Sequence, residues 1–357
     1  MGKLRFRSSA ELPFRIDLQR AAQSYLAERG EHRFADWRVG LKGAALAALS
    51  LSCYVLALRA TTMWSFAPAY IAAIVMAMML AMNTLHDAAH GALFRNAALN
   101  RLLTRATSLP MGIDADIWTR RHVHLHHTYP NVDGYDLDIE PNPFLRQTPF
   151  QDWAPQFRFQ HRYWPLVAAL SLPYLCWYGD WLDLLGKSKL RQYDKQPVPA
   201  AAFLLGKLGH LALLLGLPWY CLPAGAIGWG GLLLCYLAGV MVASCFLVAM
   251  ILGTHWAEVE FFRPGGEEMP HTWHEHQFLT CCDWQPKPRA LGHLLGGLHL
   301  HLTHHLFPAY SHRHYPALAR IVEEQARRHD LPYRCIGYQG LWRAQQNFLR
   351  GMGRRPE

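Results

Sequence analysis

Long apolar runs separated by polar and basic stretches dominate the chain. Four of these runs come close to the roughly 17 to 25 residues that a membrane-spanning helix needs, and they cover residues 43–58, 66–85, 200–222 and 226–253. Short joints at residues 59–65 and 223–225 link the first run to the second and the third to the fourth. Each pair therefore predicts a helical hairpin that crosses a bilayer and returns to its starting side.

The basic residues orient these hairpins. Arg59 is the one charged residue in the two joints, whereas the N-terminal arm (1–42), the middle segment (86–199) and the C-terminal segment (254–357) are rich in Lys and Arg. Cytoplasmic segments of membrane proteins carry an excess of Lys and Arg. Both termini and these three segments are therefore predicted to be cytosolic, and the whole chain (1–357) is interpreted as one membrane domain.

Composition narrows the class of protein. Of the 357 residues, 51% are hydrophobic and only 17% are charged, which suits a large membrane-embedded domain. A soluble helical protein with very apolar core helices is the alternative, and the lengths of the runs disfavour it. The eight cysteines show no CxxC spacing and predict neither disulfides nor a zinc site. The net charge of +9 favours anionic lipid headgroups or an acidic protein as partners, and nucleic acid is not expected.

Histidines gather where the expected spans meet the cytoplasm. The motifs are LHDAAHG at residues 85–91, WTRRHVHLHHTYPN at residues 118–131 and GGLHLHLTHHLFP at residues 296–308, with His255 at the end of the fourth run. Since all four places are expected on one face of the membrane, they can meet at one cytosolic site. Four other histidines are interpreted as solvated surface residues: His32, His312, His314 and His329.

Helical spacing selects the histidines that can point together. His86 and His90 are four residues apart and so share one helical face, and His122 and His126 repeat this spacing. His124, between the second pair, points to nearly the opposite side. The sequence therefore predicts two histidine pairs, each with a common direction.

The third motif allows two interpretations. On a helix, His301, His304 and His305 fall within an arc of about 100 degrees, and His299 falls outside it. On a strand, the alternation of leucine and histidine from residue 298 to 302 would pair His299 with His301. The helix is favoured because the alternation ends there and those residues include no β-branched side chain.

So many imidazoles favour a metal centre, although imidazole suits iron, zinc, copper and nickel alike. About nine converging histidines exceed the four ligands of a closed structural zinc site, so two ions sharing them is the economical interpretation. Two irons would form an oxygen-activating centre, and its place at the mouth of membrane hairpins indicates a lipid-like substrate. A metal-binding or metal-transporting membrane protein is the alternative, but ionisable groups along the spans should then mark an ion path.

These motifs are similar to those of the membrane fatty-acid desaturases, particularly the bacterial and cyanobacterial branch that acts on acyl-lipid or acyl-CoA. HDAAH resembles the first histidine box of that family, and HLTHHLFP resembles the third. The pattern W-x3-H-x3-HHTY-x-N-x2-G-x-D-x-D, read from residue 118 to residue 138, resembles the second. The likeness extends from about residue 85 to residue 333, and three boxes in this order make it specific.

The fold class predicted is all-α: an integral membrane protein with four transmembrane helices in two hairpins and a cytosolic helical cap that carries a di-iron site. The resemblance implies nine metal ligands: His86, His90, His122, His126, His127, His255, His301, His304 and His305. His127 and His255 rest mainly on the resemblance, since an ideal helix places His127 about 140 degrees from His122. Supporting roles are implied for Asp87, Trp118, Asn131, Asp136 and Asp138, with His161 and His276 as further candidates. No catalytic residue beyond the metal ligands is expected.

The resemblance also implies two Fe ions, O2 as co-substrate and an acyl chain carried on lipid, coenzyme A or acyl carrier protein. Its bacterial branch implies a place in a bacterial inner membrane. RPGG at residues 263–266 is similar to the HPGG motif of cytochrome b5 but has arginine in place of the histidine that serves there as axial ligand. Electrons are therefore expected from a separate donor of the ferredoxin or cytochrome b5 type. A hydroxylase or acetylenase with the same centre is the nearest alternative. His299 stands where many relatives have Asn, and His301, where they have Gln, restores an HxxHH pattern.

Overall fold

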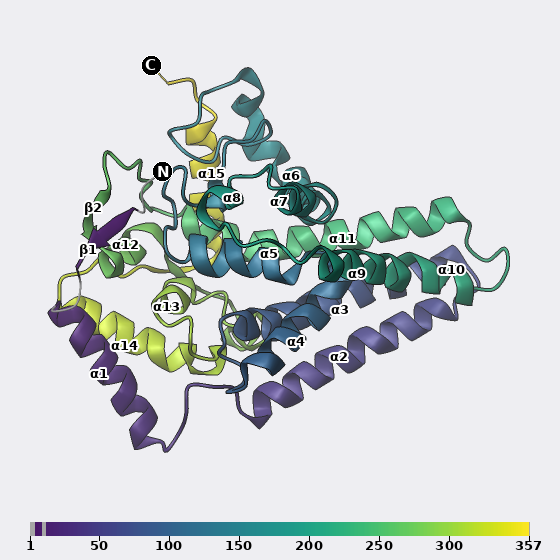
Figure 1. Ribbon diagram of the computed structural model, residues 1–357, viewed down its shortest axis with the longest axis horizontal. Helices are drawn as coiled ribbons and strands as arrows, with labels where there is room; N and C mark the ends of the chain where they lie inside the picture. Colours follow the sequence, from purple (N-terminus) through teal and green to yellow (C-terminus); the bar gives the residue numbers. More distant parts are fainter. Residues whose placement is uncertain (1–3, 9–11, 357) are drawn as a thin grey trace.

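The computed structural model describes residues 4–8 and 12–356, and helices make up most of it (Figure 1). Residues 1–3 and 9–11 of the predicted N-terminal arm lie outside the described residues. Four helical stretches are long and apolar enough to cross a membrane: Trp37–Leu58, Met63–Ala89, Ala200–Cys221 and Trp229–His255. The predicted all-α membrane fold with four spans is thus confirmed.

The first two spans are longer than their apolar runs. Helix α2 (Trp37–Leu58) begins at Trp37 because the Asp36 side chain caps it, accepting hydrogen bonds from the backbone of Arg38 and Val39. Helix α3 (Met63–Ala89) continues past the apolar run and carries His86 on its last turn. The two helices pack along each other as the first predicted hairpin.

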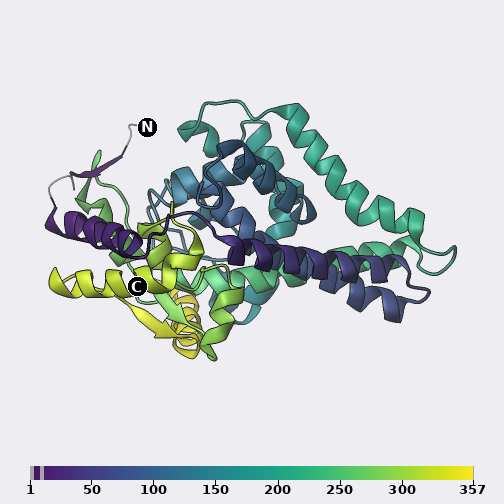
Figure 2. The ribbon, with the colours of Figure 1, turned by 90° about the horizontal axis from the view of Figure 1, so that it is seen from below.

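The second pair of spans is splayed. Its first arm consists of α9 (Ala200–Leu211), a π-helical turn (Ala212–Gly216) and α10 (Leu217–Cys221), and its second arm is α11 (Trp229–Ile251). Figure 2 shows the two arms diverging from the loop that joins them. Helix α11 packs mainly against α3 and α6 (Gln160–Tyr174), so the membrane core forms between these helices, with Phe66, Tyr70 and Leu232 fully buried.

A buried polar network fixes α9 to the segments beside it. The Lys207 ammonium donates to the carbonyl oxygens of Gly112 and Cys176, at 2.6 and 2.7 Å, and to the Asp180 carboxylate at 2.7 Å. The same carboxylate accepts a hydrogen bond from the backbone N–H of Asp114, which begins helix α5 (Ala115–Thr119). An ammonium at this depth is tolerated because all three of its protons have acceptors.

The remaining helices form the cap outside the spans. They are α1 (Pro13–Glu28), α4 (Ala97–Ser108), α7 (Asp180–Leu184), α8 (Leu190–Tyr193), α12 (Trp273–Thr280), α13 (His301–Leu306), α14 (Tyr315–Arg328) and α15 (Tyr338–Met352). Two further π-helical turns lie at Arg120–His126 and Leu175–Gly179. Short 3-10 turns lie at Leu109–Met111, Leu137–Ile139, Pro155–Phe159, Leu252–His255, Arg289–Leu294 and His312–His314.

Sheet is minor in the described residues. Strand β1 (Arg5–Arg7) pairs in parallel with β2 (Glu268–Thr272), and β3 (Asp283–Gln285) pairs in parallel with β4 (Cys335–Gly337). The second pair joins the segment before the third histidine box to the segment before α15. Both pairs therefore tie distant parts of the chain together around the cap.

Candidate metal centre

Nine histidines from four segments come together as two groups where α3 and α11 enter the cap. The first group consists of His86, His90, His122, His127 and His304, and the second of His126, His255, His301 and His305. Within each group, one nitrogen of every ring lies within 4.8 Å of those of the others. These are the same nine residues that the sequence singled out as ligands.

The first group is built on the end of α3. The His86 and His122 Nε2 atoms lie 3.2 Å apart, as do those of His122 and His127. The His127 and His304 Nε2 atoms lie 2.9 Å apart. Helix α3 thus brings the first box directly to the centre, and α13 supplies His304 from the other side.

A π-helical turn explains why His127 belongs with His122. The backbone N–H of His127 donates to the carbonyl oxygen of His122, five residues earlier, over 3.1 Å. Residues five apart come onto one face in such a turn, whereas an ideal α-helix would separate them. The turn therefore lets His122 join His127 in the first group while His126 joins the second, although the rings of His122 and His126 still stack with centroids 5.5 Å apart. His124, predicted to point to the opposite side, is exposed.

The second group joins the end of α11 to α13. The Nε2 atoms of His255 and His301 lie 2.7 Å apart, and those of His301 and His305 lie 3.2 Å apart. Helix α13 begins only at His301, which confirms the helix over the strand for residues 301–306. The two groups adjoin, since the rings of His127 and His305 stack with centroids 4.2 Å apart.

The outer nitrogens of several of these rings have hydrogen-bond acceptors. His126 Nδ1 donates to the Asp136 carboxylate, whose oxygens both lie at 3.2 Å, and His255 Nδ1 donates to the Thr280 carbonyl oxygen at 3.1 Å. His305 Nδ1 lies 2.8 Å from Gln277 Oε1. Because a proton of each ring is held on Nδ1, Nε2 is the nitrogen that faces the centre, and in the neutral ring it offers its lone pair there.

Electrostatics keep most of these imidazoles neutral. Burial, together with neighbouring imidazoles, lowers the pKa well below its usual value for His122, His127, His301, His304 and His305. Burial acts in the same direction on His126, but the Asp136 carboxylate outweighs it and raises the pKa of His126 to about 9. Neutral imidazole is the form that binds a metal.

These features fit two transition-metal ions. Lone pairs that face one another at 2.7 to 3.2 Å repel unless a cation lies among them. Five and four imidazoles form two adjoining sites, and the hydrogen bonds from the outer nitrogens fix the rings as metal proteins commonly do. Imidazole by itself does not distinguish iron from zinc, copper or nickel.

Three predicted supporting residues lie directly beside these rings. Asp136 is fully buried and also accepts hydrogen bonds from the backbone of Asn131 and Asp138, while the exposed Asp138 carboxylate reaches His126 at 3.5 Å. The Asn131 amide donates to the carbonyl oxygens of His255 and Glu260, at 3.0 and 3.1 Å. Asn131 thereby ties the second box to the end of α11.

Of the other two predicted supporting residues, Trp118 contacts a ring of the centre and Asp87 does not. The Trp118 indole stacks on the His122 imidazole with centroids 4.6 Å apart. Asp87 is buried, but its hydrogen bonds are to Ser311 and to His312 Nδ1, at 2.8 and 2.9 Å, and not to a ring of the centre.

The prediction that His312 and His314 are solvated is wrong. The other nitrogen of His312 receives the Lys42 ammonium at 2.7 Å, and His314 is fully buried between the Tyr25 hydroxyl and the His32 carbonyl oxygen. Both residues lie in the 3-10 turn His312–His314, which packs under the third histidine box and so gives their rings hydrogen-bond partners. Nothing in the local sequence indicates that this turn is buried. His32 is exposed, as expected.

Three more of the histidines that the sequence singled out lie outside both groups. His299 is buried against Trp284 in a turn that precedes α13, where Gly296 and Gly297 have positive φ, so the turn and not a helical face sets it apart. His276 donates to the Pro130 carbonyl oxygen at 2.8 Å and so contacts the turn before Asn131. His161 lies at the start of α6, beside α15 and away from the centre.

Sequence reasoning missed four residues that hold the rings or the helix that carries them. They are Tyr315, whose hydroxyl lies 2.8 Å from His304 Nδ1, Gln277, Thr280 and Asp283, which binds the backbone N–H and hydroxyl of Thr303. Gln277 is fully buried, and a buried amide needs partners, but its burial is a property of the fold that the sequence does not give. The others act through contacts that no spacing predicts.

Comparison with known proteins agrees with this geometry. The family model described as fatty acid desaturase matches residues 61–337. The chain is 29% identical over 333 residues to the sn-1 linoleoyl-lipid 6-desaturase of Synechocystis sp., covering 90% of each chain. It is 28% identical over 285 residues to the protein of the same name from Arthrospira platensis, covering 77% of this chain and 74% of that one. The acyl-lipid (8-3)-desaturase of Physcomitrium patens is 28% identical over 266 residues, which cover 72% of this chain and 54% of that one. With three quarters of its length inside the matched region, the chain belongs to the fatty acid desaturase family.

Proposed function

We propose that this fatty acyl desaturase holds two iron ions with its nine clustered histidines and uses O2 to introduce a C=C double bond into a lipid-borne acyl chain. The observation that carries the proposal is the convergence of nine neutral or carboxylate-paired imidazoles as two adjoining groups. Two irons, when bound, would supply the oxygen activation that removal of hydrogen from methylene groups requires. The names of the relatives, which describe acyl-lipid desaturases, support lipid as the carrier.

The chain's own residues would position this chemistry. Asp136 holds the Nδ1 proton of His126 and increases the basicity of that ligand, and the Thr280 carbonyl oxygen orients His255. His86 lies in the last turn of α3 and His255 in the 3-10 turn that follows α11, so an acyl chain entering from the bilayer side would meet the centre without leaving the apolar phase. The fold would thereby fix which methylene is presented.

We also propose the orientation and the electron supply. The cap and both termini would lie in the cytosol of a bacterial cell, because the segments outside the hairpins carry most of the Lys and Arg. Two electrons per turnover would come from a separate donor protein of the ferredoxin or cytochrome b5 type. A net charge of +9 would attract an acidic donor.

The test is expression in a host of known lipid composition, followed by mass spectrometric location of any new double bond. New unsaturation in glycerolipid chains supports the proposal, while a hydroxylated or acetylenic product would assign the same centre to another outcome. Metal analysis of the active, fully loaded chain checks the centre independently. Fewer than two irons for each chain would overturn the di-iron part.

A further inference from the structure

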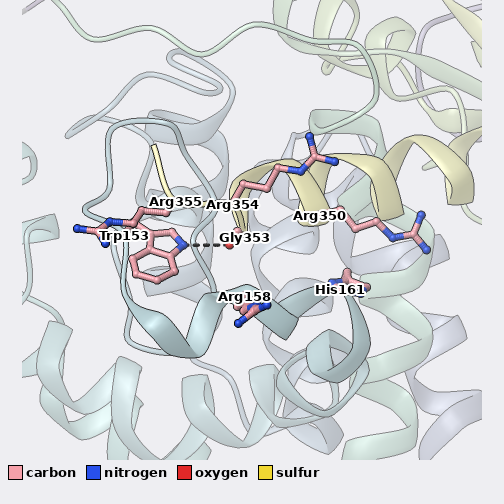
Figure 3. Close-up of a pocket in the computed structure, with 7 residues that line it drawn as sticks. All are labelled: Trp153, Arg158, His161, Arg350, Gly353, Arg354 and Arg355. Carbon is pink, nitrogen blue, oxygen red and sulfur yellow. Dashed lines mark hydrogen bonds between the residues drawn. The ribbon is translucent and has the colours of Figure 1, made fainter. Parts of the chain in front are cut away.

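A pocket lined by arginines lies apart from the nine histidines, where the end of α15 meets the start of α6 (Figure 3). Its volume is about 480 Å³, and Arg158, Arg350, Arg354 and Arg355 line it together with His161 and Trp153. The described residues of its lining include no carboxylate. None of these side chains belongs to the two histidine groups.

Specific contacts hold the end of α15 against the segment before α6 and so form this pocket. The Trp153 indole donates to the Gly353 carbonyl oxygen at 2.9 Å, and the Arg146 guanidinium donates to the Met352 carbonyl oxygen at 3.1 Å. A Cβ atom at Gly353 would lie 2.6 Å from the Phe157 carbonyl oxygen, so glycine allows the two segments to meet. The end of α15, which also carries the arginines, is thus fixed against the segment before α6.

The pocket concentrates positive charge. None of the ion pairs found within residues 4–8 and 12–356 involves its four arginines. The pKa of His161 is lowered first by burial and then by the positive charges of Arg350 and Arg162. Exposed guanidinium groups without carboxylate partners are suited to bidentate contacts with phosphate.

An exposed apolar stripe begins beside this charge. Leu166, Leu170 and Tyr174 follow one another at four-residue intervals along α6, and their exposed fractions are 57%, 45% and 52%. Arg162 stands one turn before Leu166, and its guanidinium lies 5.5 Å from the centroid of the Phe159 ring. The stripe therefore has a basic residue, Arg162, at one end and apolar side chains along the rest of it.

The opposite face of α6 is packed on a membrane span. Ser244 of α11 accepts a hydrogen bond from the backbone N–H of Leu172 at 3.0 Å and donates to the Ala168 carbonyl oxygen at 2.6 Å. The Trp177 indole donates to the Tyr236 hydroxyl of the same span at 2.9 Å. The stripe consequently faces outward beside a span, away from the helices on which α6 packs.

We propose that the arginine pocket and the α6 stripe form a binding site for an anionic membrane phospholipid. The phosphate of the headgroup occupies the pocket, where arginines bind it, and an acyl chain lies along Leu166, Leu170 and Tyr174. Charge complementarity at one end and apolar exposure along the rest select a phospholipid over a soluble anion. The site goes beyond the desaturase function, because it contains none of the nine histidines and needs no metal.

The test is native mass spectrometry of the full chain in a neutral detergent. The probes are phosphatidylglycerol, a neutral galactolipid and inorganic phosphate. The variant Arg350→Gln/Arg354→Gln should bind phosphatidylglycerol about tenfold more weakly or worse, and Leu166→Asn/Leu170→Asn should also weaken it. Arg343→Gln is the matched control, because Arg343 is exposed on α15 outside the pocket and should bind as wild type does.

Three results would overturn the proposal. They are equal binding of the galactolipid, inorganic phosphate binding as tightly as the lipid, and equal weakening by Arg343→Gln. Arg158→Gln, from a different element, serves as a second pocket variant if the double variant fails to fold. Unchanged iron content in the folded variants separates a lipid defect from damage to the histidine centre.

Discussion

The backbone N–H of His127 donates to the carbonyl oxygen of His122 over 3.1 Å, which makes a π-helical turn inside the second histidine box. This one bond places two adjacent histidines, His126 and His127, in different groups of the centre. On an ideal helix, adjacent residues already point about 100 degrees apart, but His127 would then lie far from the face of His122. The wider π turn places His127 on the same face as His122. The box therefore contributes to both histidine groups from one short segment.

Replacing His127 should empty the first group selectively. His127→Ala removes the ring whose Nε2 lies close to those of both His122 and His304, so bound iron should fall well below the wild-type content and activity should be lost. His124→Ala, at an exposed position of the same turn, should keep both. Iron analysis and product assay measure these outcomes, and equal iron in the two variants would contradict the assignment.

His301 and His299 should behave differently although both are buried. His301→Ala removes a ring of the second group and should abolish activity and lower bound iron. His299→Ala should leave iron binding largely intact, since His299 packs on Trp284 outside both groups. Iron content and turnover of the purified variants provide the check. Loss of bound iron from His299→Ala would contradict the assignment of His299 outside both groups.

Tyr315→Phe should weaken metal binding without removing a ligand. The hydroxyl of Tyr315, 2.8 Å from His304 Nδ1, holds that ring in place, and loss of such partners lowers metal affinity by about 10- to 100-fold. Competition with a chelator measures the affinity. Tyr310→Phe is the control, because its ring packs on Phe307 and not on a histidine of the centre. Identical affinities in the two variants would count against a positioning role.

Removing the Lys207 charge should destabilise the whole protein. Lys207→Met leaves the Asp180 carboxylate buried without its cation, which costs about 3 to 5 kcal/mol. Burial outweighs the influence of Lys207 and raises the pKa of Asp180 to about 6, so the loss should be larger at pH 8, where this carboxyl is ionised, than at pH 5.

The matching double variant tests the cause. Lys207→Met/Asp180→Asn should recover much of the stability, because no unpaired charge remains buried. Thermal unfolding in detergent measures all three proteins. A double variant no more stable than Lys207→Met would show that the lysine acts mainly through its two backbone acceptors.

His314 should make stability depend on pH. Burial lowers the pKa of His314 to about 4, below the ordinary value of about 6.5, so folding favours the neutral ring. Its contribution should be complete above pH 7 and should decline as the pH falls from about 6.5 to 4. The unfolding temperature of the metal-free chain, compared with that of His314→Gln across this range, isolates the effect. The wild type should lose its advantage on acidification, and a growing advantage would contradict the sign.

The sequence by itself determined the membrane character and the residues of the centre. Run length alone predicts four spans, because a helix must be apolar over the thickness of a bilayer, and the order of three boxes identifies the family. Helical spacing proposed seven of the nine clustered histidines. These features are local, so they can be read without knowing how distant segments meet.

Only the tertiary structure decided how these residues are distributed and held. Helical spacing paired His122 with His126, and their rings do stack. The π turn also brings His127 to His122 and leaves His126 with the second group, and the assumption of 100 degrees per residue cannot anticipate that turn. His312 and His314 look like surface histidines but are buried by a turn packed under the third box. Tyr315 and Gln277 became visible only once α14 and α12 were seen to lie against α13. Such contacts depend on long-range packing, which leaves no periodic trace along the chain.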